Sequence, residues 1–428
     1  MMQLLMVTNT YLPMVGGVSQ SVLRFTGAYR DRGHEVLVIA PTFKGHESDE
    51  PGVVRVPAIP NFNGSDFSVR LPIPGLLARE LDDFRPQLVH AHHPFLLGDA
   101  ALRIAAGRNL PLVFTHHTMY ERYTHYVPGD SPAMQRMAVN IATQYANLAQ
   151  QVIAPSESIA HVLRERGVDT PIEPIPTGVD GATYAQGDGA RMRRELEIPA
   201  NAIVVGHVGR LAPEKNLKGL AEAVATALDD RPKAVFLVVG EGPSAETIER
   251  LFAQRGLDAQ LRMAGKRTGD ELVCCYHAMD IFAFASKTET QGMVLAEAMA
   301  AGLPVAAVDA PGVREIVEDG DNGRLVRGDT PTELADAIGE LIDLEDNDRR
   351  AMSAGARDTS ERFDTRRCAD RALALYERVL DEAGGPIADH FQPWDRMLGR
   401  VETEWNLWRS RLDAAIDSLS NAPIPEAK

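Results

Sequence analysis

Cysteine is nearly absent from this chain, which has only three in 428 residues: Cys274, Cys275 and Cys368. An odd count with one adjacent pair excludes a disulfide framework, and the CxxC spacing of a zinc site does not occur. We therefore expect buried thiols in a reducing cytoplasm.

Long apolar runs and an excess of positive charge are absent as well. No uncharged apolar run reaches the ~18 residues of a membrane-spanning helix, so no such helix is expected. The start, MMQLLMVTNT, lacks the charged segment and cleavage site of a signal peptide and predicts a first strand. The 60 acidic and 44 basic residues give a net charge of −16. This charge argues against nucleic-acid binding, because that function needs a basic surface.

Short runs rich in valine, leucine and isoleucine alternate with helix-like segments along most of the chain. Examples are QLLMVT (3–8), EVLVIA (35–40), AIVVGHVG (202–209) and AVFLVVG (234–240). The alternation predicts α/β architecture built from βαβ units, in which helices cover both faces of a parallel sheet.

A break in this pattern divides the chain. The stretch PTGVDGATYAQGDGA (176–190) is rich in glycine, lacks periodicity and is predicted to be a linker. We expect two Rossmann-like, doubly wound parallel-sheet lobes, residues 1–178 and 179–362, facing a central cleft where ligands bind at the strand ends. Residues 363–428 are expected to form helices that pack back on the first lobe. Their amphipathic end could instead bind a membrane surface or a partner.

Two glycines and two cations lie at predicted strand ends. Gly16 and Gly17 follow the first strand and precede a helix predicted to start at Ser19, where backbone N–H groups could bind a phosphate. The alternative is a plain tight turn. In HVGRLAPEKNL, Arg210 and Lys215 could neutralise a diphosphate, or they could lie on a solvated loop.

The segment SKTETQGMVLAEAMAAG combines two carboxylates with a helix start. Glu289 lies in the loop, and Glu297 follows about two turns into the predicted helix. Gly292 allows a close approach, and the N–H groups of Met293 and Val294 begin the helix. The loop carboxylate could hold sugar hydroxyls, the helix start phosphate, and the second carboxylate a ribose. Surface glutamates on a helix are the alternative.

Half of the 12 histidines fall within 36 residues. Alternation along a strand places two of them on one face and the next on the other. No HExxH motif or closed Cys/His set occurs, so we expect no metal. The clustered residues are His90, His92, His93, His116, His117 and His125.

Taken together, these motifs resemble family 4 retaining glycosyltransferases of the GT-B fold. The resemblance rests on the Glu289/Glu297 pair, GRLAPEKN, VVGEGP and the early GGV, which occur in the family's order over about residues 3–382. It implies a nucleotide-sugar donor bound mainly by the second lobe, an acceptor bound mainly by the first, and turnover without a metal ion.

The resemblance also implies roles for single residues on the donor side. Glu289 would contact hydroxyls of the donor sugar, and Glu297 the ribose. Arg210 and Lys215 would bind the diphosphate, with Gly17 close to it. Catalysis would be front-face substitution, in which the leaving phosphate oxygen takes the acceptor proton and the two cations stabilise the diphosphate charge.

On the acceptor side, FTHHT resembles the family's strand end that carries the active-site histidine, which points to His117. HHTMYERYTHYVPG and HHPFLLG resemble diacylglycerol glucosyltransferases and indicate a lipid acceptor and peripheral membrane contact. Tyr120, Tyr123, His125 and Tyr126 would then form an amphipathic lip for the acceptor beside His117.

The donor loop TETQG resembles that of enzymes that use UDP-sugars, so we favour a UDP-hexose such as UDP-glucose over GDP-mannose. A soluble acceptor is the alternative to a lipid. Other possibilities are a nucleotide-sugar epimerase, a phosphorylase and a non-catalytic sugar-nucleotide-binding protein, because a fold alone does not decide activity.

Overall fold

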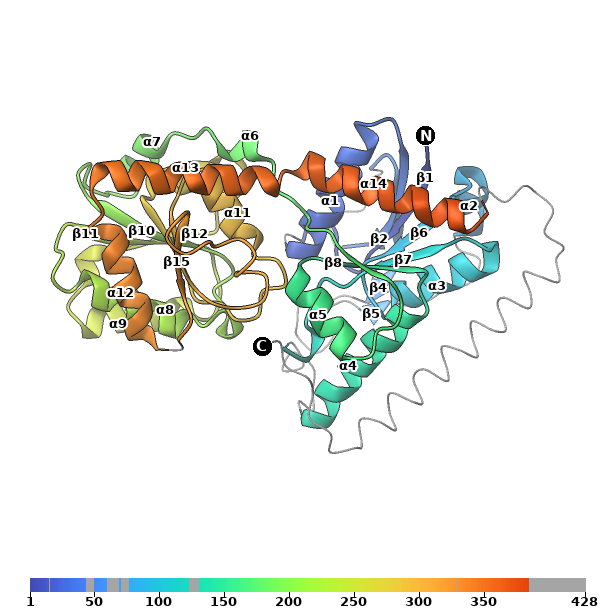
Figure 1. Ribbon diagram of the computed structural model, residues 1–428, viewed down its shortest axis with the longest axis horizontal. Helices are drawn as coiled ribbons and strands as arrows, with labels where there is room; N and C mark the ends of the chain where they lie inside the picture. Colours follow the sequence, from blue (N-terminus) through green and yellow to red (C-terminus); the bar gives the residue numbers. More distant parts are fainter. Residues whose placement is uncertain are drawn as a thin grey trace. The chain divides into compact units, whose positions relative to one another are not determined.

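The computed structural model describes residues 1–14, 16–43, 50–59, 69–70, 77–122, 131–328 and 330–384. The chain forms two compact units. Unit 1 is Met1–Thr177 with the chain from Cys368 onwards, and unit 2 is Gly178–Arg367. Each unit is built around a parallel sheet flanked by helices (Figure 1). The two doubly wound sheets confirm the predicted α/β architecture.

Unit 1 contains a seven-stranded sheet in the order β3-β2-β1-β6-β7-β8-β9, with all neighbours parallel. Its strands are β1 (Gln3–Val7), β2 (Glu35–Pro41), β3 (Val53–Val56), β6 (Leu88–Ala91), β7 (Leu112–Thr115), β8 (Gln151–Ala154) and β9 (Ile172–Pro174), and β4 (Ala58–Ile59) pairs with β5 (Val69–Arg70) separately. Its helices are α1 (Gly17–Arg30), α2 (Ala78–Phe84), α3 (Leu97–Arg108), η2 (Tyr120–Arg122), α4 (Pro132–Asn147), α5 (Glu157–Glu165) and α14 (Thr365–Glu382), whose first residues belong to unit 2.

Unit 2 contains a six-stranded parallel sheet in the order β12-β11-β10-β13-β14-β15. Its strands are β10 (Ile203–Val208), β11 (Ala234–Val239), β12 (Leu261–Gly265), β13 (Ile281–Phe284), β14 (Val305–Val308) and β15 (Gly323–Val326). Its helices are α6 (Gly181–Tyr184), α7 (Gly189–Glu195), η4 (Pro213–Lys215), α8 (Leu217–Leu228), α9 (Ala245–Gln254), η5 (Asp258–Gln260), α10 (Gly269–Ala278), α11 (Met293–Ala300), α12 (Pro331–Ile342) and α13 (Asp346–Arg362).

Strand β1, which lies inside the sheet between β2 and β6, is apolar from Leu4 to Val7 because both of its faces are buried. Side chains of a strand alternate between the two faces of the sheet. Leu5 and Val7 lie in one hydrophobic core, and Leu4 and Met6 lie in the other. Helix α14 covers the second face beside α1 (Figure 1), and the Tyr29 and Tyr376 hydroxyls lie 3.1 Å apart. Strands buried on both faces read as continuous apolar runs.

The prediction that residues 176–190 form a linker is wrong for most of that stretch. Tyr184 is buried in the core of unit 2. A Cβ atom at Gly189 would lie 2.0 Å from the carbonyl oxygen of His277 on α10. The glycines therefore serve close packing on α10 and do not supply flexibility.

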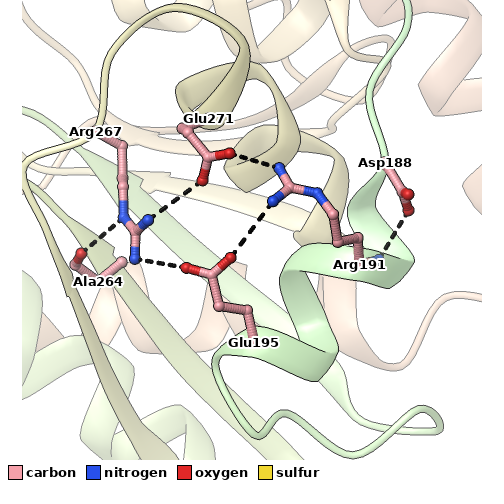
Figure 2. A network of polar contacts seen from close by, with 6 residues as sticks. All are labelled: Asp188, Arg191, Glu195, Ala264, Arg267 and Glu271. Carbon is pink, nitrogen blue, oxygen red and sulfur yellow. Dashed lines mark hydrogen bonds and ion pairs between the residues drawn. The ribbon is translucent and has the colours of Figure 1, made fainter.

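A four-residue ionic network joins α7 to α10 and to the loop between β12 and α10 (Figure 2). Arg191 pairs with Glu271 at 2.7 Å and with Glu195 at 3.5 Å, and Arg267 pairs with Glu195 at 2.9 Å and Glu271 at 3.2 Å. The Asp188 side chain caps α7 by accepting the Arg191 backbone N–H. The four side chains are 25–41% exposed, so each pair contributes little to stability on its own.

In the described part of the chain, no helix has the length and apolar character needed to cross a membrane. The three cysteines are buried free thiols, as the sequence predicts.

Candidate functional site

The GRLAPEKN loop after β10 is docked on the VVGEGP turn after β11. The backbone N–H of Leu211 donates to the carbonyl of Glu241 at 2.9 Å. Gly240 has a φ of +144°, and a Cβ there would lie 1.9 Å from the carbonyl oxygen of Gly209. Only glycine permits this close approach of two backbones. The two motifs therefore form one rigid support at the carboxyl ends of adjacent strands.

This support carries the predicted cations, and the structure pairs both of them with carboxylates. The Lys215 ammonium lies 2.5 Å from Oε1 of Glu289, and the two side chains are 18% and 20% exposed. Arg210 forms an ion pair with Glu214, which is nearly buried. The sequence analysis did not predict this ion pair, although a spacing of four residues between an arginine and a glutamate is typical of such pairs.

The loop after β13 brings Glu289 to this site through a second close contact between backbones. Gly292 has φ +68°, and it precedes α11 as its N-terminal cap. A Cβ at Gly312, in the neighbouring loop, would lie 2.6 Å from the backbone nitrogen of Gln291. Met293 and Val294 open α11. The first N–H groups of a helix have no acceptor within it and favour anions.

Glu297 lies on α11 about one turn after Met293, and not about two turns into the helix as predicted. Its side chain is buried, and the Tyr276 hydroxyl donates to its Oε2 at 3.0 Å. Tyr276 comes from α10, and no sequence pattern pointed to it. This hydrogen bond fixes the orientation of Glu297, the residue predicted to bind the ribose.

His207 is a further polar residue that the sequence analysis missed, at the end of β10. Its Nδ1–H donates to the Ala283 carbonyl at 3.2 Å, and its ring stacks against Phe282 and Phe284. Burial lowers the pKa of His207 to about 4, although the hydrogen bond to the Ala283 carbonyl opposes that shift. The imidazole is therefore neutral at pH 7.

In unit 1, α1 begins at Gly17, two positions before the predicted Ser19, because Ser19 acts within the capping turn. The Ser19 Oγ accepts the backbone N–H of Gly16 at 2.9 Å. A Cβ at Gly16 or Gly17 would meet no atom within 4 Å. Packing within unit 1 therefore does not require glycine at these two positions. The absence of side chains there leaves open space beside the start of α1.

His90 on β6, His92 just after β6 and His117 after β7 form a chain of contacts, in which His90 and His92 are buried and His117 is half-buried. His90 Nε2 lies 2.6 Å from Thr115 Oγ1, and its Nδ1 lies 2.7 Å from the Tyr376 hydroxyl on α14. His92 Nδ1 lies 2.9 Å from His117 Nε2. Burial lowers the pKa of His90 and of His117 to about 3, so these rings are neutral at pH 7.

His116 and the remaining predicted acceptor residues are placed differently. His116 is buried with its ring against Phe114 and Tyr120. Tyr120 begins η2, and its ring also contacts Phe95. Tyr120 is half-buried, and its place in the amphipathic lip stays a prediction. Tyr123, His125 and Tyr126 lie outside the described residues.

A buried ion pair that sequence reasoning missed fixes η2. Arg166 and Glu121 lie 2.7 Å apart, and their side chains are 3% and 9% exposed. The pair joins η2, just after His117, to the end of α5.

Within the described ranges, no group of three or more His, Cys, Asp or Glu side chains could hold a metal ion. Among the clustered histidines, His92 and His117 contact each other, and His90 contacts two hydroxyl groups.

Comparisons with known proteins agree with this division into two units. Residues 15–182 match the family model for glycosyltransferase family 4, and residues 188–359 match that for glycosyl transferases group 1. The chain is 29% identical to alpha-monoglucosyldiacylglycerol synthase of Acholeplasma laidlawii, over 74% of this chain and 82% of the other. It is 32% identical to a GDP-mannose-dependent alpha-mannosyltransferase of Mycobacterium tuberculosis, over 81% and 89%.

Solved structures show the same fold. Sucrose-phosphate synthase from Thermosynechococcus elongatus superposes with a TM-score of 0.73 at 20% identity, over 89% of this chain and 100% of the other. HepE of Anabaena, in complex with UDP and glucose, gives 0.69 at 24% identity, over 88% and 100%. These similarities confirm the predicted GT-B fold class.

Proposed function

The chain belongs to glycosyltransferase family 4, and from that premise we propose that it transfers a hexose from a UDP-hexose to the hydroxyl of a lipid such as diacylglycerol, with retention of configuration and without a metal ion. The observation that carries this proposal is the pairing of Lys215 with Glu289 beside the start of α11. A cation, a carboxylate and a helix start together suit a sugar diphosphate.

In this proposal, unit 2 binds the nucleotide sugar. Lys215 and Arg210 take the diphosphate with the amides of Met293 and Val294 at the start of α11. The diphosphate competes with the carboxylate now held by Lys215. Glu289 is thereby released to accept hydroxyl groups of the hexose, a role that needs a carboxylate with free lone pairs.

Further along α11, Glu297 takes the ribose hydroxyls while Tyr276 fixes its orientation. Such a bond from a neighbour keeps a binding group in its productive rotamer.

Unit 1 takes the acceptor. His117 binds a hydroxyl of the hexose or the acceptor, and the start of α1 at Gly16 and Gly17 takes phosphate. The acceptor oxygen bonds to the anomeric carbon on the face from which the diphosphate leaves. The bond from that carbon to the phosphate oxygen breaks, and the acceptor proton passes to this oxygen. The rate gain comes from stabilising diphosphate charge and orienting the acceptor.

The second candidate function is transfer of mannose from GDP-mannose to a soluble acceptor. It is supported by the similarity to GDP-mannose-dependent mannosyltransferases and by 30% identity to the D-inositol 3-phosphate glycosyltransferase of Nocardia farcinica over 93% of this chain. The name of the monoglucosyldiacylglycerol synthase supports the lipid acceptor. Contact with the inner face of the cytoplasmic membrane would follow from a lipid acceptor.

A panel of donors and acceptors tests the proposal. The full chain is incubated with UDP-glucose, UDP-galactose or GDP-mannose and with diacylglycerol vesicles, inositol phosphate or a free sugar, with and without a chelator. We expect a hexosyl-lipid product by mass, an α-linkage from an α-linked donor by NMR, and no loss with chelator. A mannosylated soluble product alone would favour the second candidate. An altered free nucleotide sugar would indicate an epimerase, and binding without turnover a non-catalytic protein.

Substitution of Gly17 tests whether the start of α1 contacts phosphate. Gly17→Ala places a methyl group in space that the unit leaves open, so we expect stability to hold while the donor KM rises about tenfold, or ~1.4 kcal/mol. The matched control is Gly27→Ala on the same helix, where a Cβ also meets no atom within 4 Å. That change should stabilise the helix by about 0.5–1 kcal/mol and leave KM unchanged. Equal KM values for the two variants would contradict a phosphate contact at Gly17.

A further inference from the structure

His92 occupies a closed position between two other histidines at the end of β6. Its ring centroid lies 4.2 Å from that of His90 and 5.2 Å from that of His117, and the His92 and His117 rings are nearly parallel at 22°. Its backbone N–H donates to the Val7 carbonyl at 3.0 Å. His92 is fully buried, so it cannot itself reach a substrate.

The hydrogen bond between His92 and His117 has a direction that the surroundings determine. His92 Nδ1 and His117 Nε2 lie 2.9 Å apart, and one must donate while the other accepts. His92 Nε2 is buried and has no hydrogen-bond partner among the described residues. A buried N–H without an acceptor is rarer than an acceptor without a donor. His92 therefore carries its proton on Nδ1 and donates it to Nε2 of His117.

This assignment requires both rings to be neutral, and burial favours the neutral form of each. Burial is the main cause that lowers the pKa of each, to about 3 for His117. A neutral imidazole bears one proton. Because Nε2 of His117 accepts, the His117 proton lies on Nδ1.

The backbone of the loop that follows His92 is also tightly constrained. Leu96 has φ +60°, a conformation that a leucine adopts only when its surroundings impose it. A Cβ at Gly98 would lie 1.9 Å from the carbonyl oxygen of His93, so the loop closes tightly on itself. Nδ1 of His93 accepts the Asn9 backbone N–H at 3.1 Å. The strand end is thus rigid enough to set the angle of its neighbour.

We propose that His92 is a positioning residue, which fixes the ring orientation of His117 and places the His117 proton on Nδ1 for a hydrogen bond to a substrate hydroxyl. This inference rests on the proposed function, in which His117 contacts the hexose or the acceptor. Such a residue affects catalysis only through the group that it orients. The same principle holds for a histidine that binds a metal through one ring nitrogen, because the hydrogen bond at its other nitrogen fixes the tautomer and the orientation of the ring.

Two substitutions at one position separate the hydrogen bond from the packing. His92→Phe keeps a flat ring between His90 and His117 but removes the donor. His92→Asn places an amide N–H where Nδ1 stands now. We expect His92→Phe to lower kcat about 10- to 100-fold with little change in donor KM, because misplaced reacting groups slow turnover by such factors. His92→Asn should recover most of the wild-type rate.

The tautomer itself is measured by the ¹⁵N shifts of the His117 ring in histidine-labelled full-length protein, assigned with His117→Gln. We expect the Nδ1–H form in the wild type and in His92→Asn, and a shift toward Nε2–H in His92→Phe. An Nε2–H form of His117 in the wild type would overturn the proposal. Loss of activity in His92→Asn as deep as in His92→Phe would overturn it as well. If no donor and acceptor pair is turned over, the proposed function fails, but the ¹⁵N shifts still decide the role of His92.

Discussion

Replacement of Lys215 with methionine is expected to lower kcat/KM for hexose transfer about 10²- to 10³-fold, the usual effect of removing one preorganised group that stabilises developing charge. Methionine keeps most of the length of the side chain and its packing while it removes the ammonium. In the absence of donor, that ammonium lies 2.5 Å from Glu289 in a setting only 18–20% exposed. Its interaction with a diphosphate is therefore weakly screened.

Lys218 provides a matched control three residues along the chain. It carries the same charge, lies on α8 and pairs with Glu222 at 3.7 Å, but its side chain is 73% exposed. An exposed pair of this kind contributes little to stability or to a distant site, so Lys218→Met should keep the wild-type kcat/KM. The two variants change net charge equally, which removes long-range electrostatic effects from the comparison.

Three measurements complete this test: kcat, donor KM, and UDP affinity by calorimetry, with the thermal midpoint as a check on folding. We expect Lys215→Met to fold normally, to bind UDP more weakly and to lose turnover with every acceptor. If Lys215→Met kept turnover and UDP affinity within a few-fold of those of Lys218→Met, Lys215 would not bind the diphosphate. In that case the pair with Glu289 would be only structural.

The sequence was sufficient to predict the fold because its main signal is local. Alternating apolar runs and helices are visible within windows of ten to twenty residues. Glycines at strand ends mark close approaches of backbone, and Gly240 and Gly292 each stand at one. The segment 176–190 shows the limit of that logic, because glycine also serves packing, as at Gly189 against α10.

The partners of the site residues could not be predicted, because each depends on contacts between distant segments. The Tyr276 bond to Glu297 joins α10 to α11, and the Arg166 pair with Glu121 spans 45 residues. Alternation along β6 correctly placed His90 and His92 on one face. It carried no information about the register of β6 with β7, which brings His92 to His117.

The buried histidines of unit 1 are expected to make it acid-labile. Burial lowers the pKa of His90, His116 and His117 to about 3 in the folded state, against about 6.5 in an unfolded chain. Between these values the unfolded state binds protons that the folded state does not. The free energy of unfolding therefore falls as pH drops from 6.5 toward 3. At pH 5.5 each such histidine costs on the order of 1 kcal/mol, and the three together cost roughly 3–4 kcal/mol.

Unit 2 and two single substitutions provide the controls for this loss. In unit 2, burial lowers the pKa of His207 to about 4, whereas in unit 1 it lowers the pKa of four clustered histidines, His92 included. Unit 2 should therefore lose markedly less stability at pH 5.5. His116→Phe removes one titrating ring that packs between Phe114 and Tyr120. His161→Gln changes a histidine whose side chain is 69% exposed.

The measurement is urea unfolding at pH 7.5 and 5.5 followed by pulse proteolysis, with surviving fragments of each unit identified by mass. We expect the difference in the free energy of unfolding between the two pH values to shrink by roughly 1 kcal/mol in His116→Phe and to stay unchanged in His161→Gln. A typical domain has only about 5–15 kcal/mol of stability, so a loss near 4 kcal/mol would expose unit 1 to proteolysis first. Equal losses in both units, or an unaltered loss in His116→Phe, would mean that these rings accept protons without unfolding.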